Sequence, residues 1–408
     1  MQEGFLMGVT ATYLFPTKPN QSEIAEQHAL GLTIGSWTDI HHLEMEQLKK
    51  HKGEVVSIEK GETKDKVKIF YPSANVSADL PAIFTTVYGK LSFFEGYELI
   101  DLEFDQDLLS QFPGPRFGAK GIREQLNVYD RPLLKAIFKG IMGRDLSFFS
   151  AQLEDLLAGG IDLVKDDEIL FENELTPFYK RITTAKEILD RHYEKTGNKV
   201  LYAVNLSGKT STLSEKAERA QELGANCLLF NVHAYGLDAL QSLRENHQIN
   251  LPIVAHSALS GVLAGQAGGG FSYELLVGKL TRLVGGDLSL FPSPYGDKSK
   301  GNVTISKEEA SAINRTLTEE NGFEKTFSVP SAGIHPGLVP QLLKDFGDNL
   351  VVNAGGGIFG HPDGPISGAQ AFRAAIDASV QHIPLSEAAN TSEPLKRALE
   401  QWGEMTVS

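Results

Sequence analysis

Short runs of apolar residues recur along the C-terminal two thirds of the chain, and the segments between them have helical spacing. Each run has the length of a buried strand. Eight of these runs follow one another, at 131–139, 162–168, 200–207, 227–233, 253–257, 288–293, 328–333 and 350–355. Helical patterns fall between them, for example at 214–223, 237–245 and 369–380. Strands that alternate with helices predict right-handed βαβ units that close on themselves. We therefore expect an α/β fold with a C-terminal (β/α)8 TIM barrel.

The first hundred residues or so have a different rhythm. Strand-like patterns occur at 9–15, 54–60, 66–71 and 97–104, and helix-like patterns at 23–32, entered through Ser22, and at 80–87. This mixed order predicts a smaller α+β domain of the ferredoxin-like type. Pro113-Gly114-Pro115 and the segment that follows have the composition of a linker. We expect an N-terminal domain over residues 1–118 and the barrel over residues 119–408.

The net charge narrows the range of partners. The 408-residue chain carries a formal charge of −14 at pH 7, which argues against nucleic acid and anionic membranes as partners. A bound phosphate must then be held by backbone amides or by a few placed cations. Cys227 is the one cysteine, which excludes an intrachain disulfide and suits a reducing compartment. No stretch reaches the roughly 18 apolar residues of a membrane span, and we expect a cytoplasmic protein.

The apolar run at 161–171 is interrupted by Lys165, Asp166, Asp167 and Glu168. Side chains alternate along a strand, so Lys165 and Asp167 share one face, and Glu168 follows where the strand passes into a loop. Buried charges are costly unless they serve each other or an ion, and oxygen ligands suit Mg²⁺. A cationic lysine is no ligand, but a neutral amine that takes up CO₂ becomes a carbamate, which is a third carboxylate. The alternative is a solvated Lys-Asp-Asp-Glu turn.

The barrel predicts where this cluster lies, because barrel active sites form at the C-terminal ends of the strands. Polar or glycine residues end several other runs. They are Lys139, Asn205, His256, Ser331-Ala-Gly333 and Gly355-Gly-Gly357. Each has a structural alternative: a satisfied core histidine, a lysine that caps its strand, or a glycine turn without a ligand. Their coincidence at one rim favours a functional site.

The glycines after the seventh and eighth runs are typical of a phosphate site, since glycine lets amide N–H groups approach an anion closely. A metal on the second strand and a phosphate cradle opposite it suit a phosphorylated substrate with oxygens near its reacting carbon. A metal that polarises a carbonyl acidifies the adjacent C–H. Enolisation is therefore the predicted class of reaction.

These motifs resemble a known family. The segment Gly160-Ile-Asp-Leu-Val-Lys165-Asp-Asp-Glu168 is similar to the metal-binding segment of the large subunit of ribulose bisphosphate carboxylase/oxygenase (RuBisCO), whose lysine is carbamylated. Ser331-Ala-Gly-Ile-His335 and Gly355-Gly-Gly-Ile-Phe-Gly-His361 resemble its two phosphate-binding segments. Gly35-Ser-Trp37-Thr resembles a motif of its N-terminal domain. The resemblance covers nearly the whole chain.

The chain also departs from the carboxylase pattern. The first barrel segment keeps Lys139 but has Ile141 in place of a second lysine, and Ser257 stands where an arginine follows the histidine. Gly31 replaces an expected acid, and the loop over 288–296 has no histidine pair and no clearly placed mobile-loop lysine. Residues for a second phosphate and for carboxylation are missing, while the metal site remains. The chain therefore resembles the RuBisCO-like (type IV) members of the family.

This resemblance implies a Mg²⁺-dependent isomerase of methionine salvage. Its reaction converts 2,3-diketo-5-methylthiopentyl-1-phosphate to 2-hydroxy-3-keto-5-methylthiopentenyl-1-phosphate. One Mg²⁺ per subunit is then held by carbamylated Lys165, Asp167 and Glu168, and the single phosphate by three glycines. The substrate-binding residues that the resemblance implies are Lys139, Lys165, Asp166, Asp167, Glu168, His256, Gly333, Gly355 and Gly356.

Lys90 is the catalytic general base that the resemblance implies. It lies in Thr85-Thr-Val-Tyr-Gly-Lys90-Leu, which is similar to a segment where the carboxylase has an asparagine that reaches a neighbouring subunit's active site. From the sequence alone, Lys90 is a surface lysine. If the base comes from a partner's N-terminal domain, the smallest active unit is a homodimer with shared active sites.

Three other functions stay open. Another RuBisCO-like isomerase, acting on a different methylthio sugar phosphate, would keep the metal-binding residues without using Lys90. A true carboxylase is disfavoured by Ser257 and by the loop over 288–296. A non-catalytic scaffold is disfavoured because all three predicted metal-binding residues are present.

Overall fold

The chain forms two compact units. The computed structural model describes residues 7–35, 45–265, 269–296 and 303–405. The N-terminal unit consists of Met1–Pro113 and Leu259–Leu276, and the barrel unit consists of Gly114–Ala258 and Val277–Ser408. The segment 259–276 thus belongs to the N-terminal unit although it follows a barrel strand in sequence. The domain limits 1–118 and 119–408 stay predictions. The sequence did not predict that segment 259–276 belongs to the N-terminal unit.

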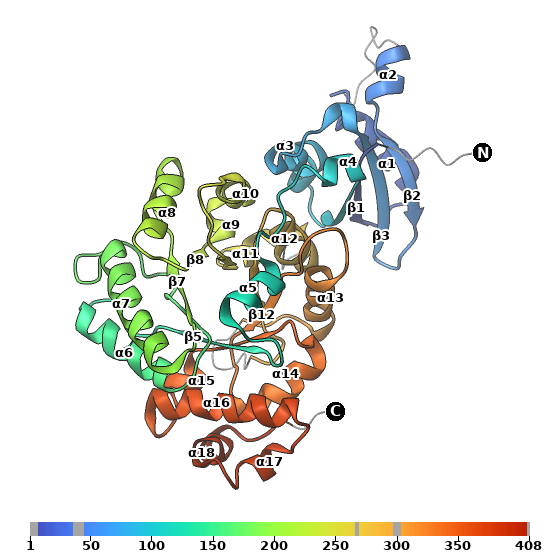
Figure 1. Cartoon of the computed structure of the whole chain (residues 1–408). Coiled ribbons are helices and arrows are strands. Elements are labelled where there is room, and N and C mark those ends of the chain that lie inside the picture. Colours follow the sequence, from blue (N-terminus) through green and yellow to red (C-terminus); the bar gives the residue numbers. More distant parts are fainter. Residues whose placement is uncertain (1–6, 36–44, 266–268, 297–302, 406–408) are drawn as a thin grey trace. The chain divides into compact units, whose positions relative to one another are not determined.

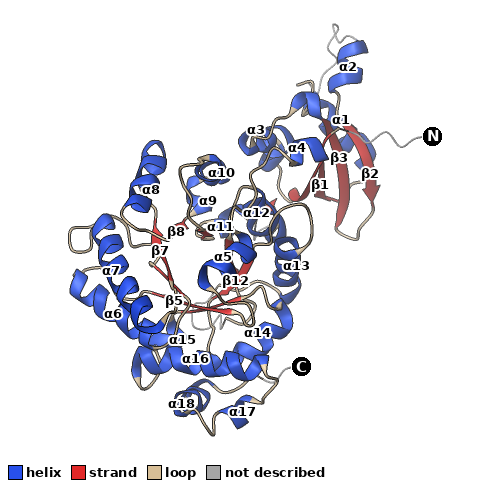
Figure 2. Ribbon diagram, in the orientation of Figure 1, coloured by secondary structure: helices blue, strands red, loops and turns tan. Residues whose placement is uncertain are grey.

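The N-terminal unit is built on a five-stranded sheet with the strand order β10-β4-β1-β3-β2. Its strands are β1 (Gly8–Pro16), β2 (Glu54–Glu59), β3 (Lys64–Pro72), β4 (Glu98–Phe104) and β10 (Gly270–Phe271). The central strand β1 pairs antiparallel with β3 and β4, and Figure 2 shows β1, β3 and β2 side by side. Val9, Ala11, Tyr13 and Phe15 alternate along β1 and are fully buried, as a strand with one core face requires. The predicted ferredoxin-like α+β domain is confirmed.

The helices of this unit differ in detail from the sequence prediction. They are α1 (Gln21–Gly31), α2 (Met45–His51), α3 (Leu80–Phe84), α4 (Gln106–Leu109) and α11 (Ser260–Leu263). Ser22 lies inside α1, whose N-cap is Asn20 without a side-chain hydrogen bond. The helix expected over 80–87 ends at Phe84 and continues as a π-helix over Thr85–Gly89. Of the motif Gly35-Ser-Trp37-Thr, only Gly35 lies within the described residues.

Eight parallel strands form the barrel. They are β5 (Leu133–Ile137), β6 (Leu163–Lys165), β7 (Leu201–Asn205), β8 (Cys227–Phe230), β9 (Ile253–Ala255), β11 (Leu288–Pro292), β12 (Phe327–Ser331) and β13 (Val351–Ala354). Their order is β12-β11-β9-β8-β7-β6-β5-β13. A parallel bridge between Ser328 and Leu350 links the two outermost strands and brings the sheet close to closure. Seven of these strands lie within predicted apolar runs, and β12 begins one residue before its run at 328–333, so the (β/α)8 architecture is confirmed.

Helices surround these strands, and Figure 1 shows α6, α7, α8 and α16 outside them. The helices of the barrel unit are α5 (Gly118–Leu126), α6 (Leu146–Ala158), α7 (Phe178–Thr196), α8 (Leu213–Glu222), α9 (Val232–Tyr235), α10 (Leu237–Glu245), α12 (Thr281–Leu283), α13 (Lys307–Thr318), α14 (Val339–Phe346), α15 (Gly356–Phe359), α16 (Gly364–Val380), α17 (Leu385–Ala388) and α18 (Glu393–Trp402). In the described part of the chain, none of the helices is long and apolar enough to cross a membrane.

The segment after Pro113-Gly114-Pro115 is not a linker, which corrects the sequence prediction. It forms α5, and Ala119, Ile122 and Leu126 are buried in the same core cluster as the inward residues of the barrel strands. The carboxylate of Asp287 accepts the amides of Phe117 and Gly118 at 2.8 Å each, which fixes the start of the helix. Side chains of α5 and of the strands therefore fill the barrel interior at this position.

Candidate active site

The predicted Lys-Asp-Asp-Glu cluster lies at the C-terminal end of β6. Lys165 is the last residue of this strand, and only 1% of its surface is exposed. Its Nζ lies 3.0 Å from the carbonyl oxygen of Asp166 and 3.0 Å from Oε2 of Glu168. Burial lowers the pKa of the Lys165 amine. This shift favours the neutral amine, which is the form that reacts with CO₂.

Two neighbouring loops add a cation and an imidazole to this cluster. Lys139 follows β5 and donates from Nζ to Oδ2 of Asp167 at 2.7 Å. Gln152 of α6 donates to the Lys139 carbonyl oxygen at 2.6 Å and so holds this loop. His256 follows β9, and its Nε2 lies 3.3 Å from Oε2 of Glu168. These contacts link three strand ends to one pair of carboxylates.

The protonation of the His256–Glu168 pair follows from its hydrogen bonds. The Ala258 amide donates to Nδ1 of His256 at 3.1 Å, so Nδ1 is the acceptor and Nε2 carries the hydrogen that Glu168 accepts. The contact with His256, together with Lys165, holds the pKa of Glu168 well below its usual range. Burial lowers the pKa of His256. Glu168 is thus ionised and His256 neutral near pH 7.

Asp166 has a different environment from its two neighbours. Its buried carboxylate accepts from the Tyr202 hydroxyl at 2.7 Å, from the Asn205 amide at 2.9 Å and from Arg181 Nη2 at 3.2 Å. The Asn205 side chain in turn donates to the Glu168 carbonyl oxygen at 2.9 Å. Asp166 was expected among the substrate-binding residues, but its oxygens are occupied by protein donors. It fixes the turn that presents Asp167 and Glu168.

The glycine segments after β12 and β13 form the opposite wall. Ala332 and Gly333 both have left-handed backbone angles, with φ of 81° and 73°. A Cβ atom on Gly333 would lie 2.7 Å from the Cα of Gly296, so this close approach requires glycine. The Asn353 side chain donates to Oγ of Ser331 at 2.7 Å and joins the two segments.

Gly355 is the first residue of the second glycine segment and lies beside Lys139. It caps α15, whose first residues are Gly356 and Gly357. Amides at the start of a helix have no intrahelical acceptor and point outward, which suits an anion. A Cβ atom on Gly355 would lie 3.2 Å from Cε of Lys139. A phosphate held here would therefore lie close to a lysine as well as to backbone amides.

Both walls line one cavity of about 640 Å³, and most of the predicted site residues lie on it. They are Lys139, Lys165, Glu168, His256, Gly333, Gly355 and Gly356. Asp167 contacts this group through Lys139. Lys90 belongs to the N-terminal unit, where it follows the π-helix and is exposed.

The same cavity has lining residues that the sequence did not reveal. Leu290, Tyr295, Asn353 and Trp402 are among them. The Trp402 ring stacks on His335 with centroids 6.2 Å apart. Trp402 ends α18, far beyond the eighth strand, and nothing in the local pattern connects it with the site. Tyr295 follows the sixth strand in a Pro-Tyr-Gly turn, and its position after a strand end was the available signal.

The donor set fits Mg²⁺ under one condition. Among the described residues, no three His, Cys, Asp or Glu side chains form a group that could hold a metal ion. Asp167 and Glu168 supply two carboxylates, and a carbamate on the buried amine of Lys165 would supply the third oxygen ligand. The site is therefore suited to a metal only in combination with the modified lysine.

Comparison with known proteins agrees with this geometry. Residues 118–402 match the family described as ribulose bisphosphate carboxylase large chain, catalytic domain. The chain belongs to the RuBisCO large-chain family. The resemblance seen in the sequence motifs is confirmed.

Relatives within the RuBisCO family include two named enolases. The 2,3-diketo-5-methylthiopentyl-1-phosphate enolase of Geobacillus thermodenitrificans (strain NG80-2) is 54% identical over 413 residues, covering 98% of this chain and 99% of the relative. The protein of the same name from Bacillus licheniformis is 52% identical over 404 residues, covering 98% of each chain. That name places these relatives among isomerase-type enzymes.

Solved structures from the RuBisCO family share the fold over the whole chain. A rubisco-like protein (MtnW) from Alicyclobacillus acidocaldarius has a TM-score of 0.91 at 40% identity, covering 97% of this chain and all of that one. The octameric carboxylase/oxygenase from Pyrococcus horikoshii OT3, in complex with sulfate, has a TM-score of 0.91 at 32% identity, covering 98% and 95%. Since the fold is common to both, function has to be argued from the site.

Proposed function

We propose that this chain is a 2,3-diketo-5-methylthiopentyl-1-phosphate enolase of methionine salvage. The observation that carries the proposal is the single cavity that joins the Lys165–Glu168 cluster to one glycine cradle. Ser257 stands where the carboxylase has an arginine for a second phosphate, which suits a monophosphate substrate. The full-length similarity to enolases of this name supports the same choice.

The substrate is held at both ends of this cavity. Amides of Gly333, Gly355 and Gly356 bind its phosphate, and Lys139 lies beside them. His256 donates from Nε2 and orients the diketone. One Mg²⁺ per subunit, bound by the Lys165 carbamate, Asp167 and Glu168, would polarise the vicinal carbonyl groups and acidify the C1 hydrogens.

The proposed reaction moves one proton without any change of oxidation state. Lys90 accepts a proton from C1, and the electrons of that C–H bond form the C1=C2 double bond. The C2 oxygen takes up the charge and is then protonated, while the C3 carbonyl is unchanged. Lys139 donates a hydrogen bond that stabilises the charged oxygen. Its pairing with Asp167 holds it in position.

The assignment of the base to Lys90 is tested by hydrogen exchange. Lys90→Ala should retain substrate binding, since it leaves the glycine loops and the Lys165 cluster intact. Exchange of the C1 hydrogen with deuterated solvent should fall by about 10²–10⁴-fold, as is typical for loss of a general base. Lys139→Ala is the matched comparison. Exchange that persists in Lys90→Ala and vanishes in Lys139→Ala would move the base to the barrel.

The surface around Lys90 supports a homodimer as the active unit. In the N-terminal unit, Phe93, Phe94 and Val262 are 89%, 46% and 79% exposed. They line a cavity of about 830 Å³ on that unit. Exposed apolar patches of this kind mark interaction sites. We propose that a second copy of the chain covers this patch and that the barrel of that copy receives Lys90. We also propose that the enzyme works in the cytoplasm.

The overall function is tested by the ultraviolet absorbance of the conjugated enol formed from the diketo phosphate. Turnover that requires Mg²⁺ is the expected result. Fixation of CO₂ on ribulose bisphosphate would instead identify a carboxylase. The second candidate is an isomerase of another methylthio sugar phosphate, because the Lys165 cluster alone would serve it. Absence of diketone turnover together with turnover of such a sugar would favour that enzyme.

A further inference from the structure

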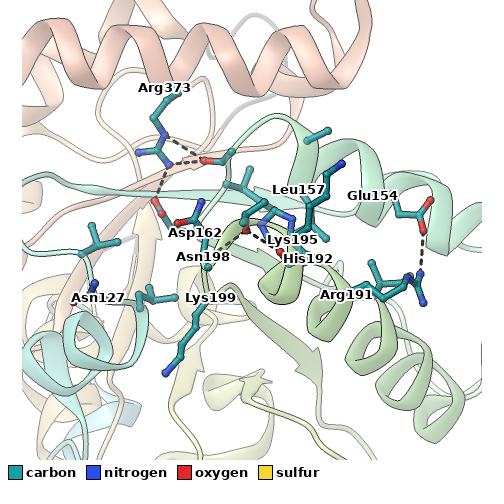
Figure 3. Close-up of a pocket in the computed structure, with 18 of the residues that line it drawn as sticks. Asn127, Glu154, Leu157, Asp162, Arg191, His192, Lys195, Asn198, Lys199 and Arg373 are labelled. Carbon is teal, nitrogen blue, oxygen red and sulfur yellow. Dashed lines mark hydrogen bonds and ion pairs between the residues drawn. The ribbon is translucent and has the colours of Figure 1, made fainter.

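A second and larger cavity lies at the opposite ends of the barrel strands. Its volume is about 850 Å³, compared with about 640 Å³ for the candidate active site. It is bordered by Asn127 at the end of α5, Ala158 at the end of α6 and Gly197 after α7. Asp162, which precedes β6, also lines it. Figure 3 shows this cavity. The proposed enolase does not use it.

The lining of this cavity is positive, although the chain as a whole carries −14. The basic side chains, leaving His192 neutral, are Arg131, Arg191, Lys195, Lys199 and Arg373, and the acidic ones are Asp130, Glu154 and Asp162. Five cations thus face three carboxylates. The excess of positive charge in a cavity attracts an anion.

Part of this excess is fixed in position. Arg131 binds both oxygens of Asp162 at 2.8 Å, and Arg373 donates to Oδ2 of the same residue at 2.9 Å. Arg373 also donates to the carbonyl oxygen of Gly160 at 2.6 Å. Two guanidinium groups therefore share one buried carboxylate. The cluster keeps a positive charge on a rigid support.

The remaining cations are available to a ligand. Lys195 and Lys199 are exposed, and within the described chain neither has a carboxylate partner at ion-pair distance. Lys199 Nζ lies 5.9 Å from the centroid of the Tyr193 ring, a contact that a phosphate would have to replace or share. Burial and then Lys195 lower the pKa of His192, which keeps that ring neutral. Glu154 and Arg191 pair at 3.3 Å on the far side of Figure 3 from Arg373. Both are about 60% exposed, so solvent screens this pair.

Helix ends do not account for this arrangement. Cations near the C-terminus of a helix compensate its dipole, and Lys195 lies in the last turn of α7. Lys199 lies beyond that helix, Arg131 lies before β5, and Arg373 is in the middle of α16. Dipole compensation therefore explains Lys195 but not Lys199, Arg131 or Arg373.

The floor of the cavity is apolar. Leu126, Leu157, Ile161 and Ile188 line it, and each is 4–5% exposed. The volume lies within the roughly 300–1,000 Å³ of small-molecule sites. We propose that this cavity binds an organic phosphate of nucleotide size, with its phosphate on Lys195, Lys199 and the Arg131–Arg373 pair and its uncharged body over the apolar floor.

Calorimetric titration of the full chain with 5′-AMP tests this proposal. We expect one saturable site per chain, with adenosine and inorganic phosphate each binding more weakly. Lys195→Glu/Lys199→Glu should weaken AMP binding by at least about tenfold. The matched control is Lys180→Glu/Lys186→Glu, which makes the same change of charge on exposed residues of α7 outside the cavity. The control should change the affinity less than about twofold.

Two further variants separate this site from other sources of anion binding. Gly355→Val removes the proposed catalytic phosphate cradle and should leave AMP binding intact. Ala158→Trp adds no charge but fills the cavity from an exposed position, and it should abolish binding. Absence of saturable binding by both AMP and ADP below about 1 mM would overturn the proposal. Equal affinity in the Lys195→Glu/Lys199→Glu protein, or binding that survives Ala158→Trp, would overturn it as well.

Discussion

The two ends of β6 carry the same residue type in contrasting environments. Asp162 precedes the strand, its side chain is 7% exposed, and its carboxylate accepts from Arg131, Arg373 and the Leu134 amide. Asp167 follows the strand, and its side chain is 20% exposed. Its carboxylate accepts hydrogen bonds from one cation, Lys139, and from the Ile169 amide at 3.3 Å. One carboxylate is saturated by the protein, whereas the other keeps capacity for a ligand.

This difference shows how one short strand supports both stability and chemistry. Burial is tolerated at Asp162 because several donors surround the charge. At the other end, Lys165 is buried with a lowered pKa, and Glu168 stays ionised beside it. In the proposed function, a Mg²⁺ ion would complete the second arrangement. Changes at the two ends should therefore affect different observables.

The largest effect is expected for Lys165→Ala. Without the amine no carbamate forms, and the proposed metal site keeps two of three carboxylates. Activity should fall on the order of 10³-fold or more, since a metal supplies several kcal/mol of charge stabilisation. The ultraviolet assay measures this loss, and circular dichroism should show an unchanged fold. The wild-type protein should need bicarbonate and Mg²⁺ together. Full activity in CO₂-free buffer would contradict the carbamate.

The next largest effect is expected for Asp162→Asn, and on stability. The change leaves two partly buried guanidinium groups without a counter-charge, which costs up to about 3–5 kcal/mol when a buried pair is broken. Urea unfolding monitored by circular dichroism measures it. Turnover per folded molecule should stay near the wild-type value. A loss of activity in protein that remains folded would mean that the two ends of β6 are coupled.

Much of this contrast could be read from the sequence. The eight apolar runs predicted the strands, and the rule that barrel sites form at strand C-termini placed Lys139, Lys165, Glu168 and His256 together. The alternation of side chains along the strand separated Asp167 from Asp166 as a metal ligand, but Asp166 was still expected among the substrate-binding residues. Only the structure shows that Arg181, Tyr202 and the Asn205 amide occupy its carboxylate. These partners come from other elements, so the local pattern contains no trace of them.

Tertiary contacts also explain the other differences. Segment 118–126 contains two glycines and several polar residues, and it becomes a helix because the barrel core covers Ala119, Ile122 and Leu126. Trp402 lies at the cavity because α18 packs beside it, and no sequence motif predicts this packing. The placement of Lys90 on the barrel of a partner rests on the family resemblance and stays a proposal.

A smaller effect is expected for Gly355→Val. A side chain here would meet Cε of Lys139 at 3.2 Å or closer and keep a phosphate from the amides. Loss of a charge-assisted hydrogen bond should weaken binding by about 1.5–3 kcal/mol. The rise should appear in KM, measured by initial rates with the diketo phosphate. Folded Asp162→Asn protein is the control and should keep its KM. An unchanged KM in Gly355→Val would remove the glycine cradle from the site.

The smallest effect is the pH dependence that Asp162 contributes to stability. Folding lowers the pKa of Asp162, because its hydrogen bonds and the two arginines outweigh burial. Its contribution to stability is therefore present above the unfolded pKa of about 3.9 and is lost as the pH falls through the folded value. Asp162→Asn lacks this contribution at every pH.

The gap in unfolding free energy between wild type and variant should stay constant from pH 7 to pH 5. Below about pH 4 it should narrow by up to about 1.4 kcal/mol per unit of pKa shift. Paired urea titrations at pH 7, 5, 4 and 3.5 measure the gap, and a gap that widens on acidification would contradict the charge pairing proposed for Asp162.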